Sequence, residues 1–266
     1  MKDNKNGIII AFVGQDGAGK TTISNIMMER LKKNNDVKSI YLGSGENYSS
    51  LIKRLYQRLG RENTKSFLKD LTGMLFYLQV AKRCVSKTIK SKKMTENGTI
   101  VFWDRCPQIQ FKGINDGPKI ESKFGKSDNI LTKLIYPYFQ KKEMYYLKKA
   151  VEIQPDIVVK LHLSVEESMR RKPDNNISKI KRKHMIVENL KFPDSEVIDI
   201  DATRPIEQEA SQIYEYIENY SFTNSSIIKD RRQNFLEQIQ QINSVEMNIS
   251  QENKENISEK DNINIR

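Results

Sequence analysis

The chain has 266 residues, of which 37% are hydrophobic and 30% charged, a composition that suits one large domain or a domain with an extension. No stretch approaches the roughly 18 apolar residues that a membrane span needs. Two cysteines, Cys84 and Cys106, are too few for a disulfide scaffold or for most Cys-based zinc sites, so we expect a reducing, cytoplasmic compartment. The formal charge is +11, and residues 224–266 are nearly neutral, so the basic excess belongs to the part before them. Such a surface suits an anionic partner (a nucleotide, a phosphorylated substrate or nucleic acid), although lysines also simply solvate surfaces.

Short apolar runs alternate with longer segments of helical spacing, which is the pattern of an α/β domain with a parallel sheet. The first run follows Lys2 and Lys5 as in a signal peptide, but it is short and leads into a glycine-rich turn. We therefore interpret it as a buried strand. Nearly continuous apolar runs predict five strands covered on both faces, at Ile8–Val13, Val37–Leu42, Thr99–Trp103, Ile157–Leu163 and Val197–Ile200.

Between these strands the apolar spacing predicts helices. A short helix over 165–171 opens with Ser164 and Glu167 in capping-box spacing and stops before Pro173. Longer helices are predicted at Thr21–Lys33, Phe67–Lys90, Ile130–Val151 and Ile206–Tyr220.

The C-terminal end differs in composition from the rest of the chain. From residue 224 onward there are 13 Asn and Gln in 43 residues, with no Gly and no Pro. One helical face in 224–247 would be formed by Ile228, Phe235, Ile239 and Ile242. Beyond about Asn248 the apolar surface is too small to offset the ordering entropy. We expect a folded domain over 1–222 and a polar extension over 223–266, partly helical and then disordered.

The most specific motif is G-Q-D-G-A-G-K-T, which fits G-x-x-x-x-G-K-[ST] between a predicted strand and a predicted helix. Its glycines let successive backbone N–H groups turn inward around phosphate oxygens, and the following helix points its positive end at them. Lys20 would bridge the β- and γ-phosphates of ATP, and the Thr21 hydroxyl would ligate Mg²⁺. The predicted nucleotide-binding residues are Gly14, Gln15, Asp16, Gly17, Ala18, Gly19, Lys20, Thr21 and Thr22.

Two further charged elements follow strands. Asp104 and Arg105 end the third strand, where the sheet topology puts the phosphate crevice. A carboxylate there can hold Mg²⁺ through its water shell, and a guanidinium can bind a phosphoryl group through two hydrogen bonds. The same two residues could also form only an ordinary solvated ion pair. Arg170 and Arg171 end the short helix after the fourth strand. They could close over a migrating phosphoryl group, or they could complement the helix dipole.

Together these residues resemble those of the thymidylate kinase family. The resemblance rests on Gly14–Thr22, Asp104-Arg105, the segment Pro155–Leu163 with the arginines after it, and Asp199-Ile-Asp-Ala before the final helix. It covers about residues 7–220. The resemblance implies a P-loop NTPase fold, a three-layer α/β/α arrangement with a five-stranded parallel sheet. It also implies Mg-ATP-dependent phosphorylation of a nucleoside monophosphate, dTMP to dTDP in the first instance, and it is compatible with a homodimer.

The resemblance also implies roles for individual residues. Asp16 would contact the sugar of the acceptor, Arg105 would bind its phosphate, and Arg170 and Arg171 would lie in the lid over ATP. Phe76 matches a phenylalanine that stacks on thymine in the family. Gln79 and Arg83 lie on the same helix face as Phe76, at i, i+3 and i+7 spacing. This face could bind a nucleobase, or it could be a partly buried helix face.

The segments near the expected acceptor differ from the family pattern. The family carries Arg-Glu-Pro-Gly after the second strand, whereas this chain reads Tyr41-Leu-Gly-Ser-Gly-Glu46, without arginine. The segment 104–118 resembles a divergent thymidylate-kinase-like branch, some of it linked to surface-polysaccharide loci. Polar residues of this segment could contact an acceptor or form turns. They are Gln108, Gln110, Asn115 and Asp116.

Three functional hypotheses remain open on the sequence. In the first, a kinase moves the γ-phosphoryl group of ATP to a nucleoside monophosphate. Lys20, Mg²⁺, Arg105 and the lid arginines would align the substrates and neutralise the phosphate charge. In the second, the acceptor is a hydroxyl of a nucleoside or of a surface-polymer precursor, which needs a carboxylate base such as Asp104 or Asp16. In the third, the chain is a non-catalytic nucleotide-binding module. Nucleic-acid binding through the basic surface is a fourth and weaker hypothesis, because no recognised nucleic-acid-binding motif is present.

Overall fold

The computed structural model describes residues 7–45, 50–61, 66–114 and 116–223. The chain divides into two compact units between Glu218 and Asn219, and the described part of the second unit is the end of one helix. The predicted tail helix over 224–247 and the predicted disorder after it lie outside the described residues. The architecture below is that of the first unit.

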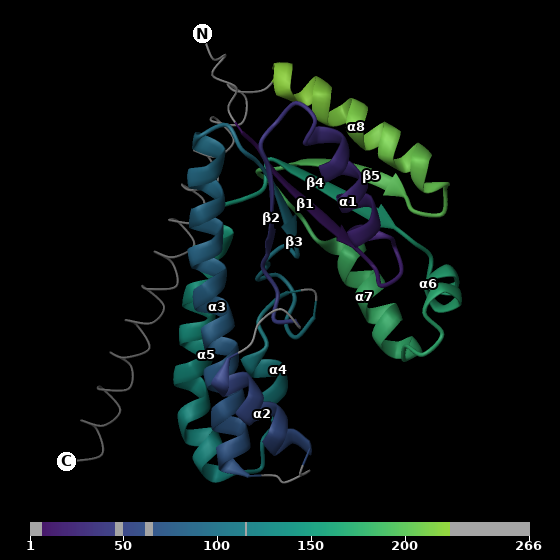
Figure 1. Ribbon diagram of the computed structural model, residues 1–266. Coiled ribbons are helices and arrows are strands. Elements are labelled where there is room, and N and C mark those ends of the chain that lie inside the picture. The colour runs from purple at the N-terminus through teal and green to yellow at the C-terminus, as the bar shows by residue number, and fades with distance from the viewer. Residues whose placement is uncertain (1–6, 46–49, 62–65, 115, 224–266) are drawn as a thin grey trace, which may run out of the picture. The chain divides into compact units, whose positions relative to one another are not determined.

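Five strands form one parallel sheet in the order β2-β3-β1-β4-β5, which confirms the predicted sheet (Figure 1). The strands are β1 (Ile9–Gly14), β2 (Val37–Tyr41), β3 (Ile100–Asp104), β4 (Ile157–His162) and β5 (Glu196–Asp201). The three central strands are buried on both faces, whereas the edge strands expose polar residues such as Lys38 on β2 and Asp199 on β5. In the sheet register Phe12 of β1 lies opposite Asp104 of β3. The parallel arrangement therefore brings the end of β1 and the end of β3 together at one edge.

Helices cover both faces of this sheet, so the predicted three-layer α/β/α class is confirmed (Figure 1). One face carries α1 and α8, which are linked by a 3.4 Å hydrogen bond from Arg30 to Ser211 Oγ. The other face carries α3, α5 and α7. The helices are α1 (Lys20–Leu31), α2 (Leu51–Arg61), α3 (Phe67–Glu96), α4 (Ile120–Phe124), α5 (Ile130–Val151), α6 (Val165–Arg171), α7 (Ile177–Asn189) and α8 (Ile206–Thr223). None of the helices in these ranges is long and apolar enough to cross a membrane.

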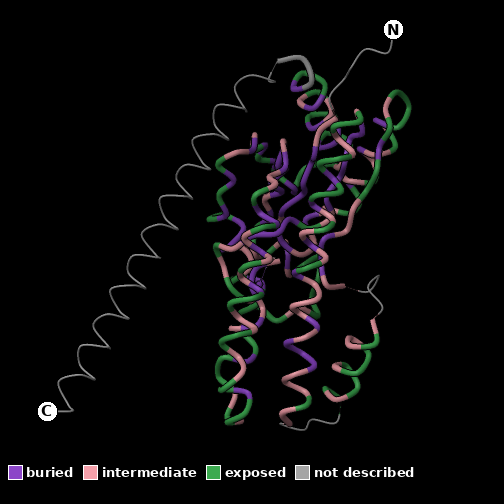
Figure 2. Tube along the Cα trace, turned by 90° about the vertical axis from the view of Figure 1, so that its left-hand side faces the viewer, coloured by how far each residue is buried: buried purple, intermediate pink, exposed green. Residues whose placement is uncertain are grey.

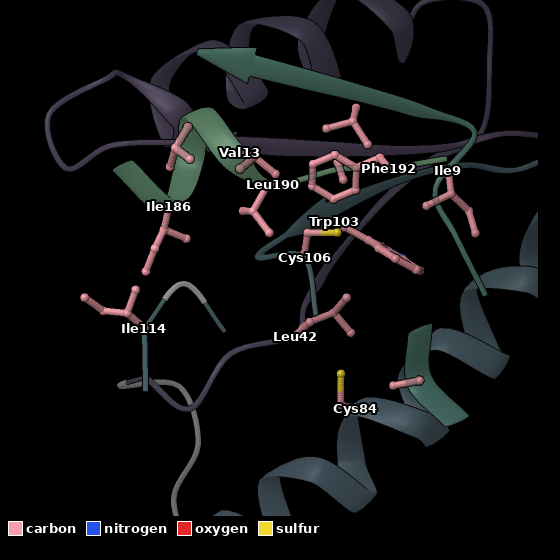
Figure 3. Close-up of a cluster of buried hydrophobic side chains, with 14 of the residues drawn as sticks. Ile9, Val13, Leu42, Cys84, Trp103, Cys106, Ile114, Ile186, Leu190 and Phe192 are labelled. Carbon is pink, nitrogen blue, oxygen red and sulfur yellow. The ribbon is translucent and has the colours of Figure 1, made fainter. Parts of the chain in front are cut away.

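One apolar core lies between the sheet and the layer of α3, α5 and α7 (Figure 3). Trp103 of β3 is 1% exposed there, and its Nε1 donates a 2.8 Å hydrogen bond to Ser91 Oγ on α3. Both cysteines lie in this core and are free. Burial raises the pKa of Cys84 to about 12, so this thiol stays protonated and packs as a small apolar side chain.

A second, smaller core is formed where α2 and α4 pack against α3 and α5 (Figure 1). Buried residues concentrate along the strands, whereas α2 has only intermediate and exposed positions (Figure 2). Gly73 of α3 permits the close packing here, because a Cβ atom at this position would come within 2.5 Å of Phe124 Cζ and 2.7 Å of Tyr56 Cε2. Helices α2, α4 and α7 were not predicted from the sequence.

Candidate functional site

The loop between β1 and α1 has the backbone of a phosphate-binding loop. Gly17 and Gly19 adopt left-handed conformations, with φ of 88° and 77°, which other residues rarely adopt. Helix α1 begins at Lys20 without a side-chain cap, so its first N–H groups remain available to an anion. Gln15 is buried, and its Oε1 accepts a 3.2 Å hydrogen bond from the backbone N–H of Leu163. This side chain fastens the loop to the end of β4, and a bound nucleotide would meet the backbone of the loop.

Lys20 lies largely buried inside this loop. Its Nζ donates hydrogen bonds to Gly14 O at 2.9 Å and to Gln15 O at 2.6 Å. Burial lowers the pKa of Lys20 to about 8, against the opposing charge of Asp16. An ammonium with so little water around it is destabilised, and an anionic ligand in the loop would relieve that.

Asp16 has a partner that the sequence analysis missed. Lys183 Nζ, on α7, donates a hydrogen bond to Asp16 Oδ2. Burial raises the pKa of Asp16, but the hydrogen bond and charge of Lys183, with the charges of Lys20 and Arg105, bring it below its ordinary value. Asp16 is therefore an ionised carboxylate already paired with a cation. No sequence signal connects two residues on separate elements 167 positions apart.

The C-terminal end of α7 is held by cationic side chains of β4. Lys160 Nζ donates a 3.1 Å hydrogen bond to Glu188 O. The His162 ring lies between Glu188 Oε1 at 2.8 Å from Nδ1 and Asp199 Oδ1 at 2.5 Å from Nε2. Burial lowers the pKa of His162, but the two carboxylates raise it more, so the net shift is upward. Positive charge at a helix C-terminus stabilises the helix and fixes the element that carries Lys183.

Helix α6 supports the phosphate-binding loop from behind. Ser168 Oγ donates a 2.6 Å hydrogen bond to Asp16 O, and Arg171 donates to Gly17 O at 3.1 Å and to Ala202 O at 3.0 Å. Arg170, the more exposed of the two arginines, makes a two-pronged bond to Glu167 at 2.7 Å for each nitrogen. In this structure Arg171 therefore ties α6 to the loop, and the lid role of both arginines remains a prediction.

The end of β3 places a guanidinium beside a partly buried carboxylate. Arg105, with a φ of 80°, pairs with Asp116, whose φ is 62° and whose Oδ2 lies 3.9 Å from Arg105 NH1. Burial raises the pKa of Asp116 above its ordinary value, against the charges of Arg105, Lys119 and Lys20. Two neighbouring non-glycine residues in left-handed conformations are uncommon and are found most often at functional sites.

Two hollows meet at Asp116. The first has a cavity volume of about 30 Å³ and opens to solvent, and its polar lining includes Gly14, Lys20 and Arg105. The second also has a cavity volume of about 30 Å³ and has a different polar lining. That lining comprises Ser44, Tyr77, Asp116, Lys119 and Glu143.

Two predicted acceptor contacts are buried and engaged within the fold. Phe76 is 5% exposed, and its ring lies 6.0 Å from that of Tyr56 and 5.0 Å from that of Tyr77, so it is part of the small helical core. Gln108 is 3% exposed and uses its amide on its own loop. Its Nε2 donates to Phe111 O and Ile114 O, and its Oε1 accepts from the N–H of Phe111.

The other predicted contacts are placed as follows. Gln79 has a buried Oε1 without a hydrogen-bond partner, and neither it nor Arg83 lines the two hollows. Gln110 bonds to the backbone of Lys191, and Asn115 lies outside the described residues. Thr21 at the start of α1 and Asp104 at the end of β3 are the side chains that could hold Mg²⁺, which binds proteins through few groups and otherwise through phosphate oxygens and water.

Comparisons with known proteins place this chain near nucleotide-binding proteins. No family model matches it. It is 24% identical over 241 residues to the uncharacterized ATP-binding protein YghR of Escherichia coli K12, covering 84% of this chain and 90% of that protein. It is 25% identical over 217 residues to a thymidylate kinase of Blochmanniella floridana, covering 81% of this chain and 97% of that enzyme. The structure of deoxyadenosine kinase from M. mycoides with bound dATP matches with a TM-score of 0.41 and 14% identity, over 79% of this chain and 99% of that one.

Proposed function

We propose that this chain is a Mg-ATP-dependent phosphotransferase of the P-loop kinase type, which moves the γ-phosphoryl group of ATP to a small acceptor. The observation that carries the proposal is the buried Lys20 ammonium inside a loop of left-handed glycines, at the uncapped start of α1. Similarity to an ATP-binding protein and to a thymidylate kinase supports it.

The proposal assigns a task to each charged group at the mouth of the loop. Backbone N–H groups of the loop would hold the phosphates, and Lys20 would turn from the carbonyls of Gly14 and Gln15 to a phosphate oxygen. Arg105 and Lys183 would add positive charge beside the transferred group. Thr21 and Asp104 would hold Mg²⁺, which, when bound, supplies further neutralisation of phosphate charge.

Catalysis by this set would come from alignment and electrostatic stabilisation. Lys20, Arg105 and Lys183 interact electrostatically around Asp16 before any substrate arrives, so the charges are already organised. Each cation is held by the fold: Lys20 by the loop, Arg105 by the turn after β3, and Lys183 by the anchored helix α7. No covalent enzyme intermediate is needed.

Two acceptor classes follow from the sequence. The resemblance to thymidylate kinases favours a nucleoside monophosphate, with dTMP converted to dTDP. The alternative is a hydroxyl group of a nucleoside or of a surface-polysaccharide precursor. The two classes make different demands on charge, because a monophosphate is close to a dianion at neutral pH whereas a hydroxyl is neutral and must lose a proton.

Coupled measurement of ADP release tests the proposed function. The purified chain, with Mg-ATP, is presented with panels of nucleoside monophosphates, nucleosides and sugars. We expect at least one acceptor to raise ADP release well above the acceptor-free rate, and Lys20→Met to abolish that increase. Lys33→Met, which changes an exposed lysine just after α1, is the matched control. Binding of ATP without any acceptor-dependent release would leave the binding-module hypothesis instead.

A further inference from the structure

The border between the two hollows carries a carboxylate that the proposed phosphoryl transfer has not yet used. We propose that the acceptor presents a hydroxyl group, and that Asp116 is the catalytic residue that takes the proton from this hydroxyl. The proposal rests on the phosphotransferase function above and specifies its acceptor class. Its basis is the position of Asp116, which lines both the hollow with the phosphate-binding cations and the hollow beyond them.

Backbone hydrogen bonds join residues 113 and 114 to residues 117 and 118, on either side of Asp116. Gly117 N donates to Ile114 O at 3.1 Å, and Gly113 N donates to Pro118 O at 2.6 Å. The buried amide of Gln108 binds the same carbonyl of Ile114 at 3.0 Å. This explains why Gln108 is buried and polar: it organises the turn that presents Asp116.

The charges of the two hollows differ in sign. The hollow on the side of the loop is lined by two cations, Lys20 and Arg105, against one carboxylate, Asp116. The second hollow is lined by two carboxylates, Asp116 and Glu143, against one cation, Lys119. Phosphoryl groups of ATP suit the first. A doubly charged acceptor phosphate would meet net negative charge in the second, whereas a neutral, hydroxyl-bearing molecule would not.

Glu143 is occupied by the fold. Glu143 Oε1 and Oε2 accept hydrogen bonds from the backbone N–H groups of Lys119 and Ile120, each at 2.9 Å, and so cap the start of α4. Among the described residues that line this hollow, Lys119 is the one cation, and two carboxylates, Asp116 and Glu143, oppose its charge. On the strand side of this hollow stand Gly43 and Ser44, neither of which carries charge.

Asp116 is also better suited to proton transfer than the two carboxylates named from the sequence. Asp16 is paired with Lys183, and its pKa lies below the ordinary value, which makes it a weaker base. Asp104 is the proposed magnesium ligand. The pKa of Asp116 lies above the ordinary value because of burial, and a base closer to neutrality is more effective in proton transfer.

The proposed phosphoryl transfer conserves atoms and charge. The O–H bond of the acceptor breaks, and its proton passes to a carboxylate oxygen of Asp116. The acceptor oxygen bonds to the γ-phosphorus of ATP, the bond from that phosphorus to the β,γ-bridging oxygen breaks, and ADP leaves with the electron pair. Asp116 then releases the proton to solvent, so each transfer yields one ADP, one phosphate monoester and one proton.

Proton release distinguishes the acceptor classes without any variant. Four deoxynucleosides, their 5′-monophosphates, and the hexoses glucose and N-acetylglucosamine are assayed with Mg-ATP at pH 8 in a weak buffer with an indicator dye. Transfer to a hydroxyl releases about one proton per ADP, because the second pKa of the product monoester is near 6. Transfer to a monophosphate oxygen releases none. The acceptor-free rate is subtracted in both cases.

Variants then test Asp116 itself. Asp116→Asn keeps the shape of the side chain and the tolerance for a left-handed backbone, so we expect ATP binding to be unchanged and acceptor-dependent turnover to fall about 10²-fold or more. Asp116→Glu keeps the carboxylate and should retain a measurable part of that turnover. Glu121→Gln, which removes the carboxylate that pairs with Lys112 on the same segment, should behave as wild type. Fluorescence of Trp103 reports whether each variant is folded.

Each outcome decides between the proposals. One proton per ADP, together with the loss in Asp116→Asn, supports both. ADP release with monophosphates alone and without protons overturns the hydroxyl acceptor and leaves the phosphotransferase intact. The role of Asp116 is overturned if folded Asp116→Asn keeps normal turnover. It is also overturned if folded Asp116→Glu loses both all turnover and ATP binding. No acceptor-dependent release from either panel overturns the proposed function and this inference together.

Discussion

The buried ammonium of Lys20 predicts an unusual dependence of stability on pH. Its pKa is lowered from 10.5 to about 8 in the folded chain, chiefly by burial. Below pH 8 both folded and unfolded chains carry the proton, and the full cost of burying the charge is present. Between pH 8 and 10.5 the unfolded chain binds more protons than the folded one, so stability rises with pH. Above that range the cost is gone.

The size of this effect follows from the same shift. A difference of about 2.5 pH units, at about 1.4 kcal/mol per unit, amounts to about 3 kcal/mol. The perturbation is Lys20→Met, which removes the titrating group. Because other lysines titrate in both proteins, the quantity to compare is the difference in unfolding free energy between wild type and variant. We expect the wild type to gain about 2–3 kcal/mol on the variant between pH 7.5 and pH 10.

Urea unfolding followed by tryptophan fluorescence measures this difference. Trp103 is the single tryptophan and lies in the apolar core between the sheet and α3, so its emission reports unfolding directly. Reducing agent is kept present because Cys84 and Cys106 are exposed in the unfolded chain. The same titration predicts that ATP affinity falls above pH 8, since a neutral Lys20 must take up a proton on binding. A difference between wild type and Lys20→Met that stays constant over this range would refute the reasoning.

Three further predictions concern the small helical core, His162 and Lys183. Gly73→Val should destabilise the chain by about 1–3 kcal/mol in urea unfolding, because a Cβ atom there meets an aromatic ring at 2.5 Å. The helical control Gly60→Ala has open space and should stabilise by about 0.5–1 kcal/mol. Because the pKa of His162 is raised in the folded chain, its contribution to the free energy of unfolding is full below pH 6.5 and is lost as pH rises through the folded pKa. The stability of wild type relative to His162→Gln should therefore shrink from pH 6 to pH 8. An unchanged difference would contradict this. Lys183→Met should lower acceptor-dependent turnover about 10²-fold in the ADP-release assay, and normal turnover would remove Lys183 from the site.

The features that the sequence predicted well have local causes. The phosphate-binding loop is contiguous, and two of its glycines adopt the left-handed backbone that the motif requires. The five strands are apolar runs, and the central ones are buried on both faces. Helix α6 was predicted from its capping box, and Ser164 Oγ indeed accepts a 3.1 Å hydrogen bond from the N–H of Glu167.

The features that the sequence missed depend on contacts between distant segments. Helix α7 is rich in charge and buries only Ile180, Ile186 and Val187, which is too weak a pattern to identify alone. Its Lys183 reaches Asp16 only because the sheet brings the two elements together. Phe76 was assigned to a base-stacking face because helical spacing cannot distinguish a pocket wall from a packed face, and α2, which covers it through Tyr56, was not predicted.

The most direct test of the central claim, phosphoryl transfer by this site, is ³¹P NMR of the purified chain with Mg-ATP and the pooled acceptors. We predict that the γ-phosphorus of ATP disappears and that a phosphate monoester resonance grows in step with ADP, in wild type but not in Lys20→Met. A new diphosphate resonance in place of the monoester would keep the kinase and replace the hydroxyl acceptor by a monophosphate. ATP that stays intact, or that yields only inorganic phosphate, would contradict phosphoryl transfer to an acceptor.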